Sequence, residues 1–96
     1  MPLYALIARD RPGLEHRQTN RPAHLEHMAK LDATGRIRYG GPLVNDSQDM
    51  VGSLIIIEAE SLDDAKATYA EDPYVIHNVF EHYEVVETMP VFPRGN

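Results

Sequence analysis

The chain has 96 residues, 43% of them hydrophobic and 25% charged, which suits one globular domain over residues 1–96 and leaves no room for a second. No run comes near the roughly 18 apolar residues of a membrane span. A net charge of −6 argues against nucleic acid as a partner. With no cysteine, the chain cannot form disulfides or thiolate metal sites, which suits a cytoplasmic protein.

The first half of the chain predicts a strand and a helix. Residues 3–8 are an apolar run bounded by turn residues, which is typical of a strand buried on both faces. Residues 14–34 carry a helical apolar stripe. Because proline disrupts a helix interior, Pro22 predicts that the regular helix either starts near Arg21 or kinks at Pro22.

The remaining elements follow from turn signals and apolar runs. In order they are a strand over 36–39, a turn at Gly40-Gly41-Pro42, a polar loop over 45–49, a strong strand over 52–58, a helix capped by Ser61, a helical turn over 73–79 and a strand over 82–87. The order β-α-β-β-α-β predicts an α+β, ferredoxin-like split β-α-β sandwich. Its four-stranded antiparallel sheet would carry two helices on one face.

The second face of this sheet needs a cover. Strands 3–8 and 52–58 are apolar at both alternating sets of positions, yet two helices can bury only one face. Leaving the other face in water would expose a large apolar patch. We therefore predict a homodimer in which the two sheets pack face to face.

Charge is distributed unevenly along the chain. Residues 1–44 contain seven Lys and Arg against four Asp and Glu, whereas residues 45–96 contain two against eleven. If Arg9, Arg11, Arg17 and Arg21 converge near the start of the first helix, they would attract a small anion such as a carboxylate or enolate. The alternative is that most of them are solvated surface charges.

His24 is the candidate for proton transfer, because a histidine titrates near pH 7 and this one borders the apolar stripe of the first helix. Asp72 is the best-marked partner, since its carboxylate would fix the tautomer while the other nitrogen exchanges a proton with a substrate. Two alternatives are open. His24 could be a helix-surface histidine, and Asp72 could cap a helix that has Pro73 at its first position. Capping and pairing can coexist, because a carboxylate has two oxygens.

Other motifs carry weaker signals. His24 and His27 have a spacing that could bind a metal jointly, but no third ligand stands at a defined position, so we predict no metal. Gly41 and Pro42 either end a strand or bring backbone amides to a ligand. Tyr74 is the one tyrosine that we expect to line a pocket.

A series of short motifs runs over nearly the whole chain. In order they are Tyr4, Asp10-x-Pro12-Gly13, Arg17-x3-Arg21-x2-His24-Leu25, Gly40-Gly41-Pro42, Gly52-Ser53-Leu54, Ser61-Leu62-x2-Ala65 and Asp72-Pro73-Tyr74. This series resembles the YciI-like (YCII-related) family. The resemblance implies a fold of the dimeric α/β barrel superfamily, which also contains muconolactone isomerase, and an active-site His and Asp that map onto His24 and Asp72. The chain departs from the pattern at Pro22, which could tilt His24.

The predicted function is a cofactor-independent small-molecule enzyme, a lyase or isomerase, in which His24 is the general acid or base and Asp72 orients it. Its substrate would be small, anionic and related to aromatic rings, as the family resemblance implies. The residues expected to bind it are Arg21, Arg17, Arg9, Gly41, Pro42 and Tyr74. Two alternatives are a dimeric binding module without turnover and an assembly subunit in which the His24–Asp72 contact is structural. An accessible cavity at the pair would disfavour the purely structural role.

Overall fold

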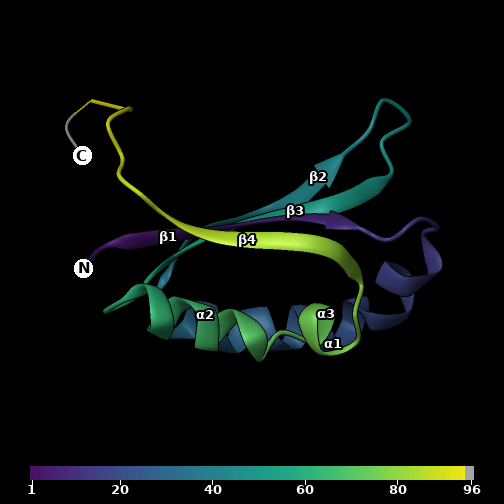
Figure 1. Cartoon of the computed structure of the whole chain (residues 1–96), viewed down its shortest axis with the longest axis horizontal. Helices are drawn as coiled ribbons and strands as arrows, with labels where there is room; N and C mark the ends of the chain where they lie inside the picture. The colour runs from purple at the N-terminus through teal and green to yellow at the C-terminus, as the bar shows by residue number, and fades with distance from the viewer. Residues whose placement is uncertain (95–96) are drawn as a thin grey trace.

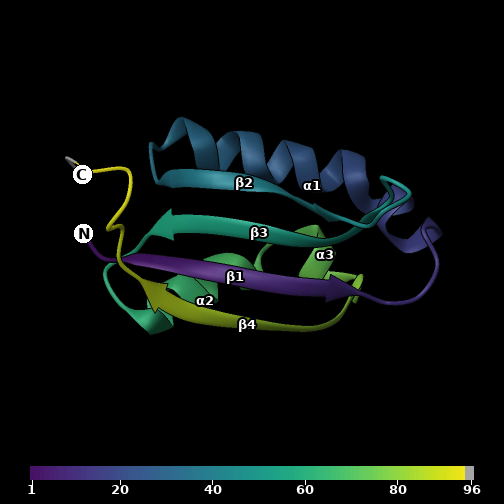
Figure 2. The ribbon, with the colours of Figure 1, turned by 90° about the horizontal axis from the view of Figure 1, so that it is seen from above.

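A computed structural model describes residues 1–94 and shows one sheet with helices on a single face. The elements are β1 (Leu3–Asp10), α1 (Glu15–Ala33), β2 (Ile37–Val44), β3 (Met50–Glu58), α2 (Leu62–Ala70), α3 (Pro73–Ile76) and β4 (Phe80–Thr88). The strands are antiparallel in the spatial order β2-β3-β1-β4. Figure 1 shows the helices beneath the sheet, and Figure 2 shows α1 along the β2 side with α2 and α3 along the β4 side. The predicted ferredoxin-like fold is confirmed.

The central strands β1 and β3 determine where the core lies. Their register sets Tyr4 opposite Ile57 and Leu6 opposite Ile55, and all four side chains are buried on the helix-covered face. Successive side chains of a strand point to opposite faces, so Ile7 points to the uncovered face, where it is 38% exposed. The sheet therefore has one covered face and one open face.

Helix α1 continues through Pro22. It begins at Glu15, so the expectation that the regular helix starts near Arg21 is wrong. Pro22 has no amide hydrogen to offer the carbonyl of Gln18, but both residues are exposed, so water can bind that carbonyl. The missing bond falls on the solvent side of α1, which leaves the inward side chains regularly spaced.

The glycines before Pro42 do not form the predicted turn. Gly40, Gly41 and Pro42 lie inside β2, which extends to Val44, so the interpretation of these residues as a strand-ending turn is wrong. The reason is the position of β2 at the edge of the sheet, where a proline removes no hydrogen bond from a second neighbouring strand. This extension carries β2 along the whole side of α1.

The two short helices begin as the sequence predicts. The Ser61 side chain accepts a hydrogen bond from the Asp64 amide at 3.1 Å and caps α2. Asp72 caps α3, which has Pro73 at its first position. The cap fixes the carboxylate of Asp72 at a defined point under the sheet.

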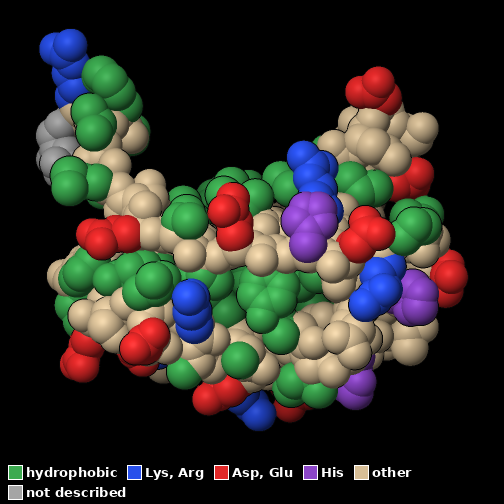
Figure 3. Space-filling view, in the orientation of Figure 1, with side chains coloured by type: hydrophobic (Ala, Val, Ile, Leu, Met, Phe, Trp, Pro, Cys, Tyr) green, Lys and Arg blue, Asp and Glu red, His purple; other side chains and the backbone are tan. Residues whose placement is uncertain are grey.

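The open face is bounded at both ends. Figure 1 shows residues 89–94, here called the C-terminal arm, rising above the sheet at one end and the β2–β3 hairpin rising at the other. Figure 3 shows hydrophobic side chains along the surface between them. Among the described residues, no helix is both long and apolar enough to cross a membrane.

Candidate active site

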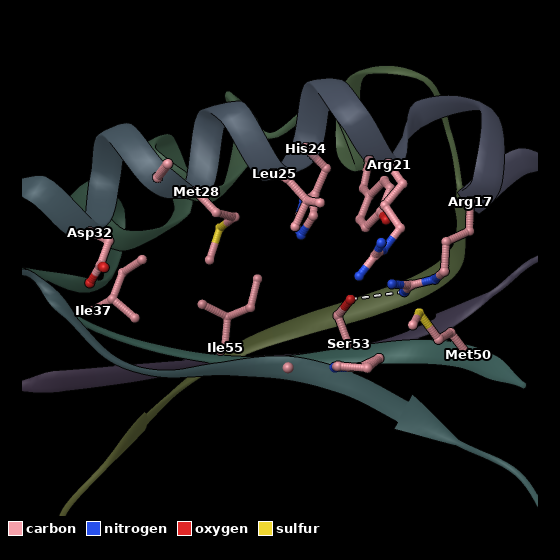
Figure 4. A pocket seen from close by; sticks show the side chains of 15 residues that line it. Arg17, Arg21, His24, Leu25, Met28, Asp32, Ile37, Met50, Ser53 and Ile55 are labelled. Carbon is pink, nitrogen blue, oxygen red and sulfur yellow. Dashed lines mark hydrogen bonds between the residues drawn. The ribbon is translucent and has the colours of Figure 1, made fainter. Parts of the chain in front are cut away.

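A cavity of about 450 Å³ lies between α1 and the β2–β3 half of the sheet, within the size range of roughly 300–1,000 Å³ that is usual for ligand pockets (Figure 4). Its lining consists of Arg17, Arg21, His24, Leu25, Met28, Ala29 and Asp32 from α1, Ile37, Gly40, Gly41 and Pro42 from β2, Met50, Ser53 and Ile55 from β3, and Tyr74 from α3. The α1 residues recur every three or four positions, so they form one stripe along the helix.

His24 and Asp72 form a buried hydrogen-bonded pair across 48 positions of sequence. The Nδ1 atom of His24 lies 2.8 Å from Oδ1 and 3.0 Å from Oδ2 of Asp72. A carboxylate only accepts hydrogen bonds, so Nδ1 carries a hydrogen, and in the neutral imidazole Nε2 then has the free lone pair. The proline at position 22 does not prevent the contact.

Asp72 serves two partners at once. Its Oδ1 atom also accepts a hydrogen bond from the backbone amide of Tyr74 at 2.9 Å. The carboxylate therefore caps α3 and holds the imidazole of His24, so the two interpretations of Asp72 from sequence both apply. The cap restricts the rotation of the carboxylate, and this in turn fixes the direction of the histidine ring.

The second ring nitrogen of His24 is open to the cavity. No hydrogen bond of the protein reaches Nε2 in residues 1–94, and no buried side-chain nitrogen or oxygen in that range lacks a partner. Nε2 is therefore not sealed. Figure 4 shows His24 pointing from α1 toward the sheet. A base at this position can reach a molecule in the cavity.

Tyr74 fixes the plane of the imidazole. Its ring stacks on His24 with centroids 3.8 Å apart and an angle of 9° between the planes. Burial raises the pKa of Tyr74, as does the nearby Asp72 carboxylate, while Arg17 and Arg21 oppose the rise. The phenol is therefore protonated at neutral pH and can donate a hydrogen bond.

The three candidate arginines have different environments. Arg17 is 5% exposed and binds Asp10 through Nε at 2.6 Å and Nη2 at 3.0 Å. Its Nη2 also donates to Ser53 at 2.9 Å, so its charge is compensated. Arg21 is exposed, lines the cavity and has no ion-pair partner in the described part of the chain. It is the arginine that is available to an anion.

Arg9 does not belong to this group. It follows Ala8, whose side chain is buried beneath the sheet, so the alternation of the strand directs Arg9 to the opposite, open face. It is exposed and does not line the cavity. The prediction that Arg9 helps to bind the substrate is wrong for this cavity.

Sequence reasoning missed part of the site. Asp32 and Met28 line the cavity, and neither of them was assigned to a binding site from the sequence, although Met28 also packs against the core. The spacing of Arg21, Leu25, Met28 and Asp32 along one helical stripe was a usable signal for both. No spacing in the sequence predicted the ion pair between Asp10 and Arg17. In residues 1–94 no group of three His, Asp or Glu side chains could hold a metal ion.

The fold and the site define a small α+β domain in which a buried His–Asp pair borders a ligand-sized cavity. A model of the YCII-related domain matches residues 2–89 of the chain. The chain therefore belongs to the YCII-related domain family, as the motif series suggested. Protein YciI of Escherichia coli is 40% identical over 97 aligned residues, which cover 94% of this chain and 99% of that protein.

Two solved structures are similar in fold. The 5-chloro-2-hydroxyhydroquinone dehydrochlorinase of Burkholderia phenoliruptrix, solved with 2,5-dihydroxybenzoquinone, is 34% identical with a TM-score of 0.80. The match covers 91% of this chain and 93% of that one. A NIPSNAP family protein of Agrobacterium tumefaciens, 20% identical with a TM-score of 0.55, covers 95% of this chain and 93% of that one. This second likeness shows the fold alone.

Proposed function

We propose that the chain is an acid–base enzyme, a lyase or isomerase, that acts on small anionic ring compounds. The observation that carries the proposal is the His24–Asp72 contact of 2.8 Å, with Nε2 of His24 open to a cavity that also holds the unpaired Arg21. A base, an orienting carboxylate and a cation are sufficient for proton transfer next to an anion. The proposed reaction therefore uses no cofactor.

The proposed reaction is the loss of HX from a hydroxylated ring. The substrate reacts as a tautomer in which the carbon that bears X is tetrahedral, because a ring hydroxyl has passed its proton to that carbon. Nε2 of His24 then takes a proton from another O–H group, and the released electron pair forms a new π bond. The bond between carbon and X breaks, and X leaves as an anion with the bonding electrons. The imidazolium, held by Asp72, then gives its proton to solvent, while Arg21 offsets the negative charge on the ring oxygens.

The similarity to the dehydrochlorinase supports this choice of reaction. That protein acts on a chlorinated hydroxyhydroquinone and was solved with a dihydroxyquinone bound, which is a flat ring that bears acidic hydroxyls. In this chain, Met28, Met50 and Ile55 provide apolar walls for a flat ring. Arg21 and His24 lie on α1 beside Met28, and they face Met50 and Ile55 of β3 across the cavity.

The test is an assay of chloride release from 5-chloro-2-hydroxyhydroquinone, with product formation followed by quinone absorbance. We expect His24→Ala to lower kcat by about 10²- to 10⁴-fold, the usual contribution of positioned acid–base catalysis. The control is His27→Ala, which alters a half-buried histidine of α1 outside the cavity. Equal kcat in His24→Ala and wild type would reject the mechanism. Binding without turnover would instead identify a binding module.

A second variant tests the anion site. We expect Arg21→Gln to raise KM by about 10- to 150-fold, because a hydrogen bond to a charged group contributes about 1.5–3 kcal/mol. Lys30→Gln is the control, because Lys30 pairs with Glu26 on the solvent side of α1. A change in kcat alone, with KM unchanged, would show that Arg21 does not hold the bound substrate.

The open face of the sheet supports a homodimer, which we propose as the assembled form. Tyr39 is 49% exposed and Val86 is 38% exposed on this face, and the half-buried Leu54 and Ile56 lie between them. A second copy presents the same apolar surface, so face-to-face packing covers both. Sedimentation equilibrium should give twice the chain mass for wild type and the chain mass for Ile56→Glu. A monomeric wild type would contradict the dimer.

A further inference from the structure

We infer that the substrate is elongated, and that Asp32 recognises a hydrogen-bond-donating group, an amine or a hydroxyl, at its end remote from His24. This inference rests on the proposed function for the assignment of the reacting end to His24. It concerns the far end of the same cavity, which the proposed reaction leaves unused.

The cavity is longer than the reaction requires. Asp32 follows His24 by eight positions on the same helix, which at 1.5 Å per residue separates them by about 12 Å along the axis. Both line the cavity, and so do Leu25 and Met28 between them. Figure 4 shows Asp32 and Ile37 at one end of this space and Arg17 and Met50 at the other. A single substituted ring held at His24 leaves the Asp32 end empty.

The polarity of the cavity changes along its length. At one end are the guanidinium of Arg21 and the imidazole of His24. The middle is formed by Met28 and Ile55, which offer no hydrogen bonds. At the far end is the carboxylate of Asp32. A ligand that matches this order has an anionic group, an apolar body and a donor group.

No contact within residues 1–94 explains an acidic side chain at position 32. It lies in the last turn of α1, where the helix dipole disfavours a negative charge. Its backbone carbonyl accepts from Gly35 at 2.9 Å, but its carboxylate forms no hydrogen bond or ion pair within residues 1–94. The other acid in the second half of α1, Glu26, pairs with Lys30. The carboxylate of Asp32 is therefore free to bind a donor from a ligand.

The test uses two probes of equal chain length, 8-aminooctanoate and octanoate, which differ only in the terminal amine. Each is titrated into ¹⁵N-labelled protein, and the dissociation constant is obtained from amide shifts. An exposed ion pair contributes about 0.2–1 kcal/mol, so we expect wild type to bind 8-aminooctanoate about two- to fivefold tighter than octanoate. The amine should shift the amides of Asp32 and Ile37.

Asp32→Asn should remove this preference, whereas the charge-matched control Glu26→Gln should keep it. The measured quantity is the ratio of the dissociation constants of octanoate and 8-aminooctanoate. Both probes have a carboxylate, so a general effect of the lost protein charge on that carboxylate cancels in the ratio. Three results would overturn the inference: no preference in wild type, an unchanged preference in Asp32→Asn, or no binding of either probe.

Failure of this inference is distinguishable from failure of the proposed function. His24→Ala keeps the Asp32 carboxylate, so it should keep the preference for 8-aminooctanoate while losing turnover. A preference that depends on Asp32 in a protein that turns over no ring compound would reject the proposed reaction alone. Turnover that depends on His24, without any effect of Asp32 on the preference, would reject the elongated substrate alone.

Discussion

The two halves of the helix layer, one beneath β1 and β4 and the other beneath β2 and β3, differ in how closely they approach the sheet. Beneath β1 and β4, α2 presents Ala65, which is fully buried, and Tyr69, whose hydroxyl lies 2.8 Å from the carbonyl oxygen of Tyr4 and 3.0 Å from that of Ile55. Beneath β2 and β3, α1 presents the long side chains of His24 and Met28, and a cavity remains. Ala65 and Tyr69 fill the space beneath β1 and β4, whereas His24 and Met28 leave a cavity beneath β2 and β3.

This difference separates stability from function. The packed half buries apolar side chains and saturates its polar groups, so substitutions there should act mainly on the free energy of unfolding. The open half contains the cavity, so its side chains are less closely packed. Substitutions along its cavity should act mainly on binding and turnover.

The largest expected effect is in the packed half. Tyr69→Ala should lower the free energy of unfolding by about 4 kcal/mol, because truncation of a buried aromatic ring leaves a cavity. Urea denaturation followed by circular dichroism measures the loss. A loss below about 2 kcal/mol would mean that the α2 half is not closely packed.

The next effect concerns the buried ion pair at the boundary between the halves. Asp10→Asn should cost about 3 kcal/mol, since Arg17 would keep its charge in a buried place without a counter-ion. Asp46→Asn in the exposed loop removes the same charge and serves as control. Equal stability of the two variants in urea would show that Arg17 is solvated.

Asp72 should show an intermediate effect that depends on the replacement. Asp72→Ala should cost about 2 kcal/mol, roughly half of it from the lost cap of α3 and the rest from the unpaired His24. Asp72→Asn keeps an oxygen for the Tyr74 amide, so its loss should be about half as large. Equal losses in the two variants would show that the cap of α3 does not contribute to the free energy of unfolding.

At alkaline pH the free energy of unfolding should fall more through Tyr69 in the packed half than through Tyr74 at the cavity. Burial raises the pKa of Tyr69, so the folded state holds the phenol proton more tightly than the unfolded state, whose pKa is 10.0. The stabilisation is complete below pH 10 and falls as the pH rises toward the folded pKa, by at most about 1.4 kcal/mol per pH unit.

Tyr69→Phe should therefore flatten the decline of stability above pH 10, as measured by urea denaturation at a series of pH values. Tyr74→Phe should flatten it less, because Arg17 and Arg21 oppose the rise in the pKa of Tyr74. A steeper decline in Tyr69→Phe than in wild type would contradict the upward direction of the Tyr69 pKa shift.

The smallest effect is expected at the cavity wall. Met28→Ala should cost about 1 kcal/mol, below the roughly 2–5 kcal/mol of a fully packed methionine, because its side chain already borders empty space. The same variant should weaken the binding of octanoate, which the amide titration measures. A loss near 4 kcal/mol, equal to that of Tyr69→Ala, would remove the contrast between the halves.

Local patterns were sufficient to predict the fold, whereas the central pair was favoured over its alternatives by the family resemblance. Apolar runs marked the strands, Ser61 and Asp72 marked helix starts, and the resemblance carried by the motif series implied that His24 and Asp72 form the site. Each of these signals lies within a few residues or in a known order of motifs, which is why sequence alone could carry it.

The remaining features depend on which face a side chain occupies. Arg9 was grouped with Arg17 because both are near the start of α1, but strand alternation puts it on the far side of the sheet. The extension of β2 through Pro42 depends on an edge position that no local pattern reveals. The cavity itself exists because α1 stands away from β2, which is a property of long-range packing.

The shared carboxylate of Asp72 has a consequence for the divergence of related chains. Selection for folding alone would retain a capping acceptor at position 72, for which asparagine serves as well as aspartate, whereas only selection for the pocket would retain His24. Under the proposed function, loss of catalysis in a descendant would therefore show first as replacement of the histidine, with a capping residue left at position 72. Presence of the aspartate is poor evidence of catalysis, and presence of both residues is the informative state.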